Sequence, residues 1–521
     1  MIRILLICPP MTVRGNDTTT PGAIPPLGLA SVAAYLETHG FDVKIIDTLI
    51  EGLNTVQRAK HQIRVGLSTQ QIKDRISYYQ PQIAGVSSMF TAYAPDAHRV
   101  AKITKSLNPN TLVVFCGAHA SILPESVLSY KNVDLVVVGE GEETMLYIAT
   151  RFSLKQKLNH IPGTVSRLQN GRILKNPPRP YIQNLESLPL PARHLLPMDL
   201  YLNATKNISH SYTYRSPSTP IITSRGCPGN CIYCAVPGIW GRTWRPHSAK
   251  RIVDEIQFLA QRYGVKEIQF LDDNISVNRQ RLVEICDLII QRKIDVKWTT
   301  PNGIAIWTLD KSLLQKMKQS GCYRLTFGIE TGHPETQKFI RKHLDLNKAK
   351  KIIKTASSLG LWIFSTYIIG FPYETESLIK TTFNYAISSY SDFVVFILLM
   401  PFPHTDVTQI MLKEKILKKN QLKPSVIGET FSGYKGIGNK YLSATKIRQL
   451  HRQADKRLMI NRLLWPITRP WAIIRKIHNF EDLKYFSKIV TNFLIMFLSS
   501  LKFGELKTHR LSTAKKYQII K

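Results

Sequence analysis

Three cysteines with the spacing C-x3-C-x2-C are the residues of this chain best suited to chemistry. They are Cys227, Cys231 and Cys234, and an aromatic residue, Tyr233, directly precedes the last of them. Three thiolates on one short loop can bind three irons of a cubane iron–sulfur cluster, which normally has four cysteine ligands. The fourth iron would be open to a substrate or cofactor, so the motif predicts a reaction centre rather than an electron relay.

Two other interpretations of the cysteines stay open. A structural zinc site needs four ligands, and His247, the candidate for the fourth, lies thirteen residues after Cys234 at no standard spacing. The cysteines could also be unpaired core thiols. The surroundings favour the cluster, because a strand-like run at residues 219–224 precedes the loop and a helix pattern starts at residue 248. Loops that follow strands in this way carry the chemistry of α/β barrels.

The cysteine motif resembles the signature C-x3-C-x-aromatic-C of the radical S-adenosylmethionine (SAM) enzymes. Later strand ends resemble further motifs of that family, namely LDDN at residues 271–274, PNG at 301–303, FGIETG at 327–332, IIGFPYE at 368–374 and MPFPHT at 400–405. The chain departs from the family at Thr366, where a glycine is usual, and at Glu374, which lies one place later than usual.

This resemblance implies a [4Fe-4S] cluster whose open iron binds the amino and carboxylate groups of SAM. One electron from the cluster then cleaves SAM to a 5′-deoxyadenosyl radical, which requires an external electron donor similar to flavodoxin or ferredoxin. The residues that the resemblance assigns to SAM binding are Tyr233, Asp272, Asp273, Asn302, Glu330 and Gly370. From the residues alone, Asp272 or Asp273 could instead cap the next helix. An unpaired Glu330 at a buried strand end would be costly, which favours a ligand role.

Six strand–helix units are expected between residues 216 and 405. Short strands rich in Ile, Phe, Thr and Tyr alternate with helix patterns at residues 248–263, 279–292, 310–320, 346–359 and 376–388. The pattern alone predicts a parallel α/β barrel, and the resemblance implies a (β/α)6 partial TIM barrel. The cysteines and the expected SAM contacts all fall at carboxyl ends of strands, where such barrels place their active sites.

Residues 1–150 predict a separate α/β domain. Strands are expected at residues 2–8, 43–47, 83–87, 111–116 and 134–139, with helices at 28–38, 70–79, 94–107 and 124–129. This alternation predicts a doubly wound parallel sheet of the flavodoxin or Rossmann kind, which binds ligands at the carboxyl ends of its strands. The sequence has no G-x-G-x-x-G motif, so a dinucleotide site is not indicated.

This domain resembles the cobalamin-binding domain that precedes the barrel in one subclass of radical SAM enzymes. The similar pieces are PPLGLA at residues 25–30, Gly117-x-His119 and GEGE at residues 139–142. The resemblance implies cobalamin and assigns its contacts to Ser87, Ser88, Thr91, Gly117, His119, Gly139, Glu140 and Gly141. His119 is interpreted as a cofactor contact and not as a base.

The loop D-x-H-x-x-G, whose histidine binds cobalt in many cobalamin proteins, is missing after the first strand. His98 follows Asp96 and Ala97 but lies within a helix pattern, and we interpret it as a solvated helix residue. The lower face of the cobalt is therefore expected to lack a histidine ligand. The alternative is a sheet that binds no cofactor.

The remaining cysteines, together with an oxygen-sensitive cluster, indicate a cytoplasmic protein. Cys8, Cys116, Cys286 and Cys322 are scattered in apolar runs, which is typical of free buried thiols in a reducing compartment. The first ten residues lack the features of a signal peptide.

Residues 151–215 are rich in proline and are expected to form a linker with a hairpin at Asn170-Gly171.

Residues 406–521 form a basic region that is expected to be helical. The chain has a formal net charge of +34, and residues 401–521 hold 24 Lys and Arg against seven Asp and Glu. Apolar residues recur at helical spacing, namely Phe486, Ile489, Val490, Phe493, Leu494, Phe497, Leu498 and Leu501. This run is too short to span a bilayer, and it predicts peripheral contact with the inner membrane face through residues 482–503.

Two alternatives for the basic region are weighed against membrane contact. One is a helix that packs on the barrel with a solvated basic face. The other is nucleic-acid binding, which we favour least because positive charge attracts phosphate unspecifically. Trp465 and Trp471, which have arginines nearby, would suit the headgroup layer of a membrane.

The two resemblances together imply a cobalamin-dependent radical SAM enzyme. Its expected reaction is methyl transfer to an unactivated carbon or phosphorus of a small-molecule or lipid-like substrate, with the cofactors supplying the chemistry. The first alternative is a radical cyclase or oxidoreductase that acts on a tetrapyrrole or a lipid. The second is a tRNA methylthiotransferase, although the first domain lacks three cysteines for a second cluster. A non-catalytic cobalamin sensor would have no use for a cluster with an open iron.

Overall fold

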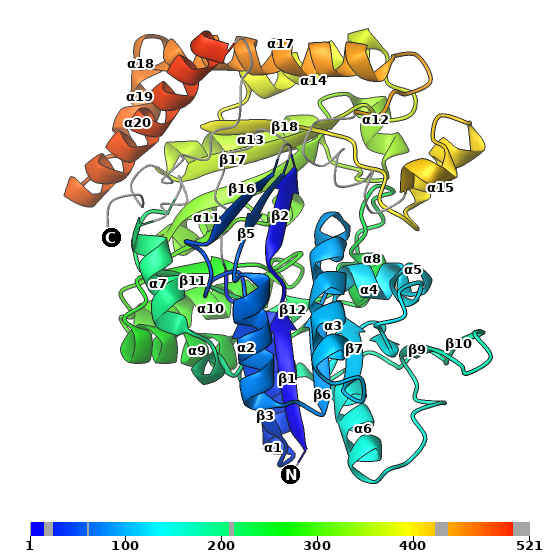
Figure 1. Cartoon of the computed structure of the whole chain (residues 1–521). Coiled ribbons are helices and arrows are strands. Elements are labelled where there is room, and N and C mark those ends of the chain that lie inside the picture. Colours follow the sequence, from blue (N-terminus) through cyan, green and yellow to red (C-terminus); the bar gives the residue numbers. More distant parts are fainter. Residues whose placement is uncertain (1, 15–23, 60–61, 208–212, 423–435, 504–521) are drawn as a thin grey trace.

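The computed structural model describes residues 2–14, 24–59, 62–207, 213–422 and 436–503 (Figure 1). In Figure 1 the first α/β unit lies at the lower centre and right, and the second extends from its left side to above it, with α17 along the top and α18 to α20 at the upper left. The expected α/β class, with a doubly wound first sheet and a second parallel sheet, is confirmed.

The first unit is a seven-stranded sheet whose central strands are parallel and buried on both faces. All five residues of the strand at Ile83–Ser87, for example, are buried. Across the sheet the strands are β10 (Ile173–Lys175), β9 (Thr164–Arg167), β8 (Leu135–Val137), β7 (Leu112–Cys116), β6 (Ile83–Ser87), β1 (Arg3–Cys8) and β3 (Asp42–Asp47). The main helices are α1 (Leu27–Thr38), α2 (Thr69–Tyr79), α3 (Ala94–Leu107), α5 (Pro124–Leu128) and α6 (Glu142–Ser153).

The hairpin expected at Asn170-Gly171 forms, and it belongs to the first sheet. Strands β9 and β10 pair with each other, and β9 also pairs antiparallel with β8. Gly171 has φ +81° at the turn, a conformation that favours glycine. The expected boundary at residue 150 therefore falls inside α6, and the first unit continues into the segment that we expected to be only a linker.

A small antiparallel sheet that the sequence analysis did not predict lies between the two units (Figure 1). It consists of β2 (Met11–Arg14), β4 (Val56–Ala59) and β5 (Gln62–Val65). The carboxylate of Asp96 on α3 accepts hydrogen bonds from the backbone N–H and the hydroxyl of Thr12, each at 2.8 Å, and so fastens this sheet to the first unit. From the sequence, residues 17–22 are a candidate loop over the space between the two units, and they lie outside the described residues.

The second unit is a parallel six-stranded sheet whose strand order follows the chain. The strands are β11 (Ser218–Ile221), β14 (Glu267–Phe270), β15 (Lys297–Thr300), β16 (Cys322–Glu330), β17 (Trp362–Ile369) and β18 (Phe393–Leu398). The helices between them are α9 (Ala249–Tyr263), α10 (Arg279–Gln291), α11 (Lys311–Gln319), α13 (Leu346–Ser358) and α14 (Glu376–Ser388). Side chains cap all five helix starts, which explains why sequence patterns located them well.

The last helices pack around the second unit. They are α15 (Asp406–Lys413), α17 (Ala444–Leu463), α18 (Trp465–Thr468), α19 (Pro470–Ile474) and α20 (Phe480–Phe503). Within the described residues, none of the helices has the length and hydrophobicity that crossing a bilayer requires.

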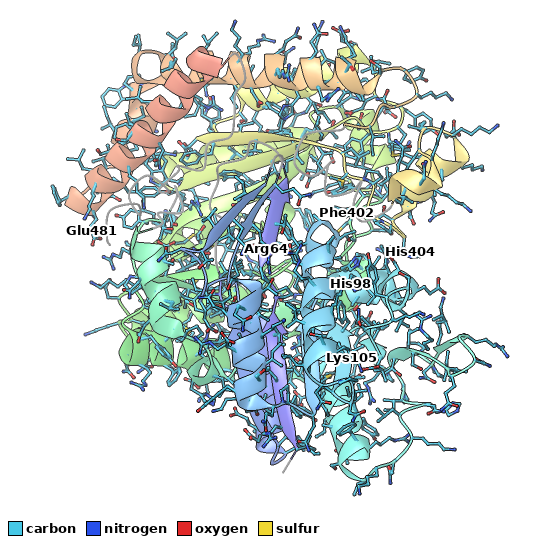
Figure 2. The ribbon with its side chains drawn as sticks, in the orientation of Figure 1. Arg64, His98, Lys105, Phe402, His404 and Glu481 are labelled. Carbon is cyan, nitrogen blue, oxygen red and sulfur yellow. The ribbon has the colours of Figure 1, made fainter. Side chains whose placement is uncertain are left out.

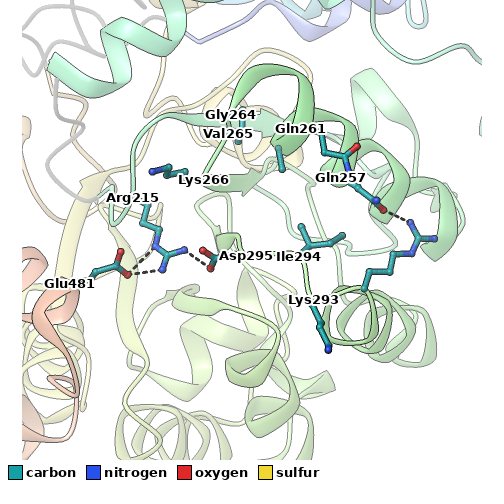
Figure 3. A pocket seen from close by; sticks show the side chains of 12 residues that line it. Arg215, Gln257, Gln261, Gly264, Val265, Lys266, Lys293, Ile294, Asp295 and Glu481 are labelled. Carbon is teal, nitrogen blue, oxygen red and sulfur yellow. Dashed lines mark hydrogen bonds and ion pairs between the residues drawn. The ribbon is translucent and has the colours of Figure 1, made fainter.

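The start of α20 is anchored at the amino-terminal end of the barrel. Arg215 pairs with Glu481 and with Asp295, each at 2.7 Å, beside a surface pocket of about 440 Å³ (Figure 3). Tyr485 is buried against Tyr323 and Trp362. This pocket lies at the end of the barrel that usually serves stability rather than catalysis.

The membrane face predicted for residues 482–503 needs correction in its first turns. Phe486 and Ile489 pack against the aromatic cluster around Trp362 instead of facing outward, as the alternative of a barrel-packed helix requires. Trp465, expected in a headgroup layer, is also buried. The side chains of Phe493, Phe497, Leu498 and Leu501 lie outside the described residues.

Glu267 is a fully buried carboxylate at the start of β14. It accepts hydrogen bonds from the backbone N–H groups of Tyr214 and Arg215, each at 2.8 Å, and from the hydroxyl of Tyr323 at 2.9 Å. Burial raises the pKa of Glu267 to about 7, because the charged form is poorly solvated there.

We expect Glu267→Gln to remove a pH-dependent loss of stability. The folded pKa is higher than the unfolded one, so the folded protein holds the proton more tightly. This stabilising contribution is present below about pH 4.5 and is lost as the pH rises through about 7. The free energy of unfolding of the unsubstituted protein should fall over that window by about 1–3 kcal/mol relative to the variant. Denaturant unfolding at several pH values measures this difference, and a constant difference would contradict the expectation.

Candidate active site

The cysteine loop follows β12 (Ser224–Arg225), which pairs with β13 (Arg245–Pro246). Gly226 has φ +84°, and a Cβ at this position would lie 2.3 Å from the carbonyl oxygen of Thr243, so only glycine fits the turn into the loop. A Cβ at Gly229 would lie 3.4 Å from the Sγ of Cys227 and 3.9 Å from that of Cys231. These two thiols therefore flank the same point of the loop.

The electrostatics of the thiols fit metal-dependent deprotonation. Burial raises the pKa of Cys227, and it raises the pKa of Cys234 to about 11. Without metal these thiols are protonated at neutral pH, so binding of iron must release their protons.

The arrangement of ligands fits a cubane better than a single metal ion. Among the described residues, no three or more His, Cys, Asp or Glu side chains surround one ion position. This is expected for a cubane, in which each cysteine binds a different iron. His247, the candidate for a fourth zinc ligand, has its Nδ1 3.5 Å from Glu186 instead.

Asp272 holds the strand end before the cysteine loop in place. Its buried carboxylate accepts hydrogen bonds from the backbone N–H and hydroxyl of Thr223 and from the hydroxyl of Ser224. These hydrogen bonds show that Asp272 positions this segment, and its contact with SAM stays a prediction. Neither Asp272 nor Asp273 caps α10, since Asn278 does so.

Asp273 is available to a ligand. It makes no hydrogen bond or ion pair within the described part of the chain, and it is half-buried. Burial, together with the neighbouring charge of Asp272, raises its pKa to about 6. Asp273 also lies near enough to Cys227 and Cys234 for its charge to raise the pKa of both thiols. This position fits the predicted contact with SAM.

Glu330 has a strained backbone and a partner that the sequence analysis missed. Its φ of +69° lies in the left-handed region, which is costly for a glutamate and is typical of functional sites. Its carboxylate accepts a hydrogen bond from the Nζ of Lys342 at 3.0 Å. Burial alone would lower the pKa of Lys342, but the negative charge of Glu330 raises it overall. Lys342 is therefore a cation beside the cysteine loop, and its position in the sequence carries no motif that marks it.

The remaining expected SAM contacts lie at neighbouring strand ends. Gly370 has φ +95°, and its N–H donates to Glu374 at 2.7 Å. Burial raises the pKa of Glu374 to about 7, and one of its oxygens has no hydrogen-bond partner among the described residues. Asn302 is exposed and donates to the carbonyl of Leu271 at 2.8 Å. The ring of Tyr233 packs against that of Phe371.

The residues predicted to contact cobalamin gather at the carboxyl ends of three adjacent strands. Ser87 is the last residue of β6 and Ser88 follows it, Gly117 and His119 follow β7, and Gly139 follows β8. Backbone hydrogen bonds fasten these ends together, since His119 N–H donates to the carbonyl of Ser88 at 3.0 Å.

This edge of the first sheet can accept a ligand. Gly117 has φ +104°, and a Cβ there would lie 2.8 Å from the carbonyl oxygen of Ser88. The buried hydroxyl of Ser88 has no hydrogen-bond partner in the described regions. An unused buried polar atom is uncommon and indicates a missing partner. The predicted residues therefore fit a bound cofactor.

Two buried histidines lie on this side of the first unit. His119 contacts the hydroxyl of Thr91 through Nδ1 at 3.1 Å, and burial lowers its pKa to about 4. The interpretation of His98 as a solvated residue is wrong, because its side chain is buried and its ring stacks on those of Phe115 and Tyr130. Figure 2 labels His98 on α3. Both imidazoles are neutral at pH 7, because burial lowers the pKa of each to about 4.

Glu140 belongs to a buried salt-bridge cluster between the two units. One oxygen of Glu140 accepts from Arg225 at 2.9 Å and from Arg245 at 2.8 Å, and the other accepts from the N–H of Ile182 at 2.6 Å. Arg225 also pairs with Glu142 at 2.6 Å. These contacts show that Glu140 joins the two units, and its contact with cobalamin stays a prediction.

We call Arg225, Arg245, Glu140 and Glu142 the interdomain salt-bridge cluster. It brings the edge of the first sheet, where Gly139 and Gly141 lie, against the strand that leads into Cys227. The two expected cofactor sites thus face each other, although their residues are about a hundred positions apart in the sequence. The sequence analysis did not predict the role of these four side chains, because the GEGE motif at residues 139–142 was its only indication.

Comparisons with known proteins agree with this geometry. Residues 13–149 match the B12 binding domain family, and residues 221–386 match the radical SAM superfamily. An uncharacterized methyltransferase from Pyrococcus horikoshii is 34% identical over 422 residues, which cover 80% of this chain and 84% of that protein. Cytidylyl-2-hydroxyethylphosphonate methyltransferase from Streptomyces wedmorensis is 32% identical over 394 residues, which cover 71% of this chain and 73% of that protein.

One solved structure shows a similar fold. It is the radical S-adenosylmethionine methyltransferase TsrM from Kitasatospora setae, solved with cobalamin and a [4Fe-4S] cluster bound. The TM-score is 0.66 at 15% sequence identity, and the match covers 88% of this chain and 89% of that chain. At this identity the likeness concerns the fold alone.

Proposed function

The chain belongs to the radical SAM enzymes that carry a B12-binding domain, and we propose that it methylates an unactivated carbon or phosphorus atom of a small-molecule or lipid-like substrate. The observation that carries this proposal is the interdomain salt-bridge cluster. It holds the edge of the first sheet against the cysteine loop, as an enzyme that uses both cofactors on one substrate needs.

The proposal assigns roles to residues of both units. Cys227, Cys231 and Cys234 hold the cluster, and Asp273 and Asn302 offer polar groups to SAM. Ser88 and His119 offer polar contacts to cobalamin. When bound, the cluster supplies an electron to SAM, and cobalamin carries the methyl group.

We divide the chain into four parts on this basis. Residues 1–150 form the cobalamin-binding unit, 151–215 a linker whose hairpin extends its sheet, 216–405 the radical SAM core and 406–521 the basic helical region. Residues at the facing edges of the first and third parts position the substrate and exclude water.

The reaction consumes two SAM molecules and two electrons for each methyl group transferred. One SAM gives its methyl group and leaves as S-adenosylhomocysteine. The other is cleaved to methionine and takes a hydrogen atom from the substrate, leaving as 5′-deoxyadenosine. The new carbon–carbon or carbon–phosphorus bond replaces the bond to that hydrogen. Both electrons come from an external donor of the flavodoxin or ferredoxin kind, which this proposal requires as a partner.

Product analysis tests the proposal. The protein is reconstituted anaerobically with iron, sulfide and hydroxocobalamin, and is then incubated with reductant, SAM with a deuterated methyl group and a small-molecule extract. We expect equal amounts of S-adenosylhomocysteine and 5′-deoxyadenosine and one metabolite that gains the deuterated methyl group.

Other outcomes of the same assay identify the alternatives. Turnover that yields 5′-deoxyadenosine without S-adenosylhomocysteine would overturn methyl transfer and favour ring formation. Label in co-purified tRNA would favour methylthiolation. Iron uptake without cobalt would mean that the first sheet binds no cobalamin.

The proposal also includes a cytoplasmic location with peripheral contact at the inner membrane face. The free cysteines support the first part, and the basic excess of the last residues supports the second. Because the first turns of α20 pack on the barrel, another surface must make this membrane contact.

A further inference from the structure

We propose that the outer surface of helices α17 to α19 binds an anionic lipid bilayer. We call this surface the α17–α19 patch, and its exposed apolar residues are Ile460, Leu463, Leu464, Ile467, Trp471 and Ile474. The inference rests on the peripheral location proposed above and not on the methyl-transfer reaction. It moves the expected lipid contact from the first turns of α20 to a surface of which the sequence analysis singled out only Trp471.

Exposed apolar residues are concentrated at this end of the chain. Of the 28 large hydrophobic side chains that are exposed in the described residues, ten lie between residues 460 and 494. Ile467 is 80% exposed and Trp471 is 67% exposed. Scattered apolar residues on a surface are ordinary, but a contiguous group indicates an interaction site.

The helices present these residues outward in an ordered way. Positions 460, 463, 464 and 467 have the spacing i, i+3, i+4 and i+7, which places them along one side of a helical path. The opposite side of α17 carries Leu450, Ala454 and Leu458, which pack into the protein core. Helices α18 and α19 lie at the upper left edge of the molecule, away from the first unit (Figure 1).

Basic residues border the patch. Lys456, Arg457, Arg475 and Lys484 are exposed. Two other arginines support the patch from beneath, because Arg462 and Arg469 lie 4.0 Å and 5.4 Å from the ring centre of the buried Trp465. Near a cytoplasmic leaflet each exposed Lys or Arg adds to the attraction to anionic lipids.

Charge decides between a bilayer and a second copy of the chain as the occupant. With a net charge of +34, two copies would repel each other when they bring these basic edges together. An anionic bilayer has complementary charge and an apolar layer beneath it. A tryptophan such as Trp471 suits the boundary between these layers.

Vesicle flotation with the full chain tests the inference. The vesicles are either pure phosphatidylcholine or a mixture with phosphatidylglycerol. We expect binding to the anionic vesicles only, weakened by salt, and at least tenfold weaker in the double variant Ile467→Glu, Trp471→Glu. Both side chains are mostly exposed, so the variant should fold, and its thermal unfolding midpoint checks this. The matched control is Tyr78→Glu on α2, which replaces a side chain that is 92% exposed and should leave binding unchanged.

Three outcomes would overturn the inference. Binding that the double variant does not weaken would place the lipid contact elsewhere, for example on α20. Equal binding to neutral vesicles, or none to either kind, would remove the role of anionic lipid. A dimer that the double variant converts to a monomer, without vesicle binding, would make a second copy the occupant.

Formation of 5′-deoxyadenosine by the same variants separates this inference from the proposed reaction. We expect both variants to keep this activity, because neither substitution touches the cysteine loop or the first sheet's ligand edge. Loss of vesicle binding with activity retained supports the patch alone. A chain that binds vesicles but makes no methylated product would refute only the reaction.

Discussion

Replacement of Cys231 by alanine is expected to abolish cluster binding and all cleavage of SAM. The three thiolates of the loop are the protein's whole contribution to a cubane with one open iron, so two remaining ligands hold it poorly. The iron content per chain after anaerobic reconstitution should fall from about four atoms to a small remaining fraction. Formation of 5′-deoxyadenosine with a chemical reductant should fall to background. Absorption spectra and iron analysis measure the first effect, and chromatography of the nucleoside the second.

The matched control is Cys286→Ala. Cys286 is also a free cysteine, but it is buried on α10 and lies outside the loop. This variant should keep its iron and its activity. If Cys231→Ala bound as much iron as the control, the cluster would have to be elsewhere, and the assignment of the active site would fail.

Replacement of Arg225 by methionine is expected to lower the free energy of unfolding by about 3–5 kcal/mol, because it leaves the buried Glu142 without its ionic partner. In the intact protein, burial alone would raise the pKa of Glu142, but Arg225 lowers it overall. This depressed pKa contributes stability above the unfolded pKa that is lost as the pH falls. In the variant the unpaired carboxyl should have a raised pKa, so the loss should be largest at neutral pH and shrink in acid. Denaturant unfolding at several pH values measures it.

Two further variants make this prediction specific to the salt-bridge cluster. The double variant Arg225→Met, Glu142→Leu removes both charges and should recover much of the lost stability, since buried ion pairs are often replaceable by apolar side chains. The control is Lys250→Met in an exposed pair with Asp254, where the loss should stay below about 1 kcal/mol. Equal losses for Arg225→Met and Lys250→Met would show that the cluster does not hold the two units together.

Much of the fold could be predicted because its signals are local. Helix starts such as Ser248 and Asp310 carry their capping side chains in the sequence, and the apolar strands between them show the alternation of a parallel α/β fold. The small sheet that includes residues 11–14 and 62–65 was missed, since its pairing joins segments about fifty positions apart. Turn residues and periodicity say nothing about such a pairing.

The candidate site divides in the same way. Cys227, Cys231 and Cys234 are ligands of one loop, so their spacing alone identifies them. Lys342 can be recognised only from the fold, which brings its Nζ within hydrogen-bond distance of Glu330, because no sequence motif marks it. His98 looked solvated in a helix pattern, but the fold brings Phe115 and Tyr130 against its ring and buries it.

By itself, the sequence determined the two α/β units, their order and the cysteine loop, because helix periods, caps and ligand spacing act over a few residues. Only the tertiary structure decided that Glu140 and Glu142 pair with Arg225 across the two units, and that α20 packs its aromatic face on the barrel. The physical reason is the same for both. A buried charge or an apolar face must find a complementary partner, and which partner it meets depends on how distant segments are brought together.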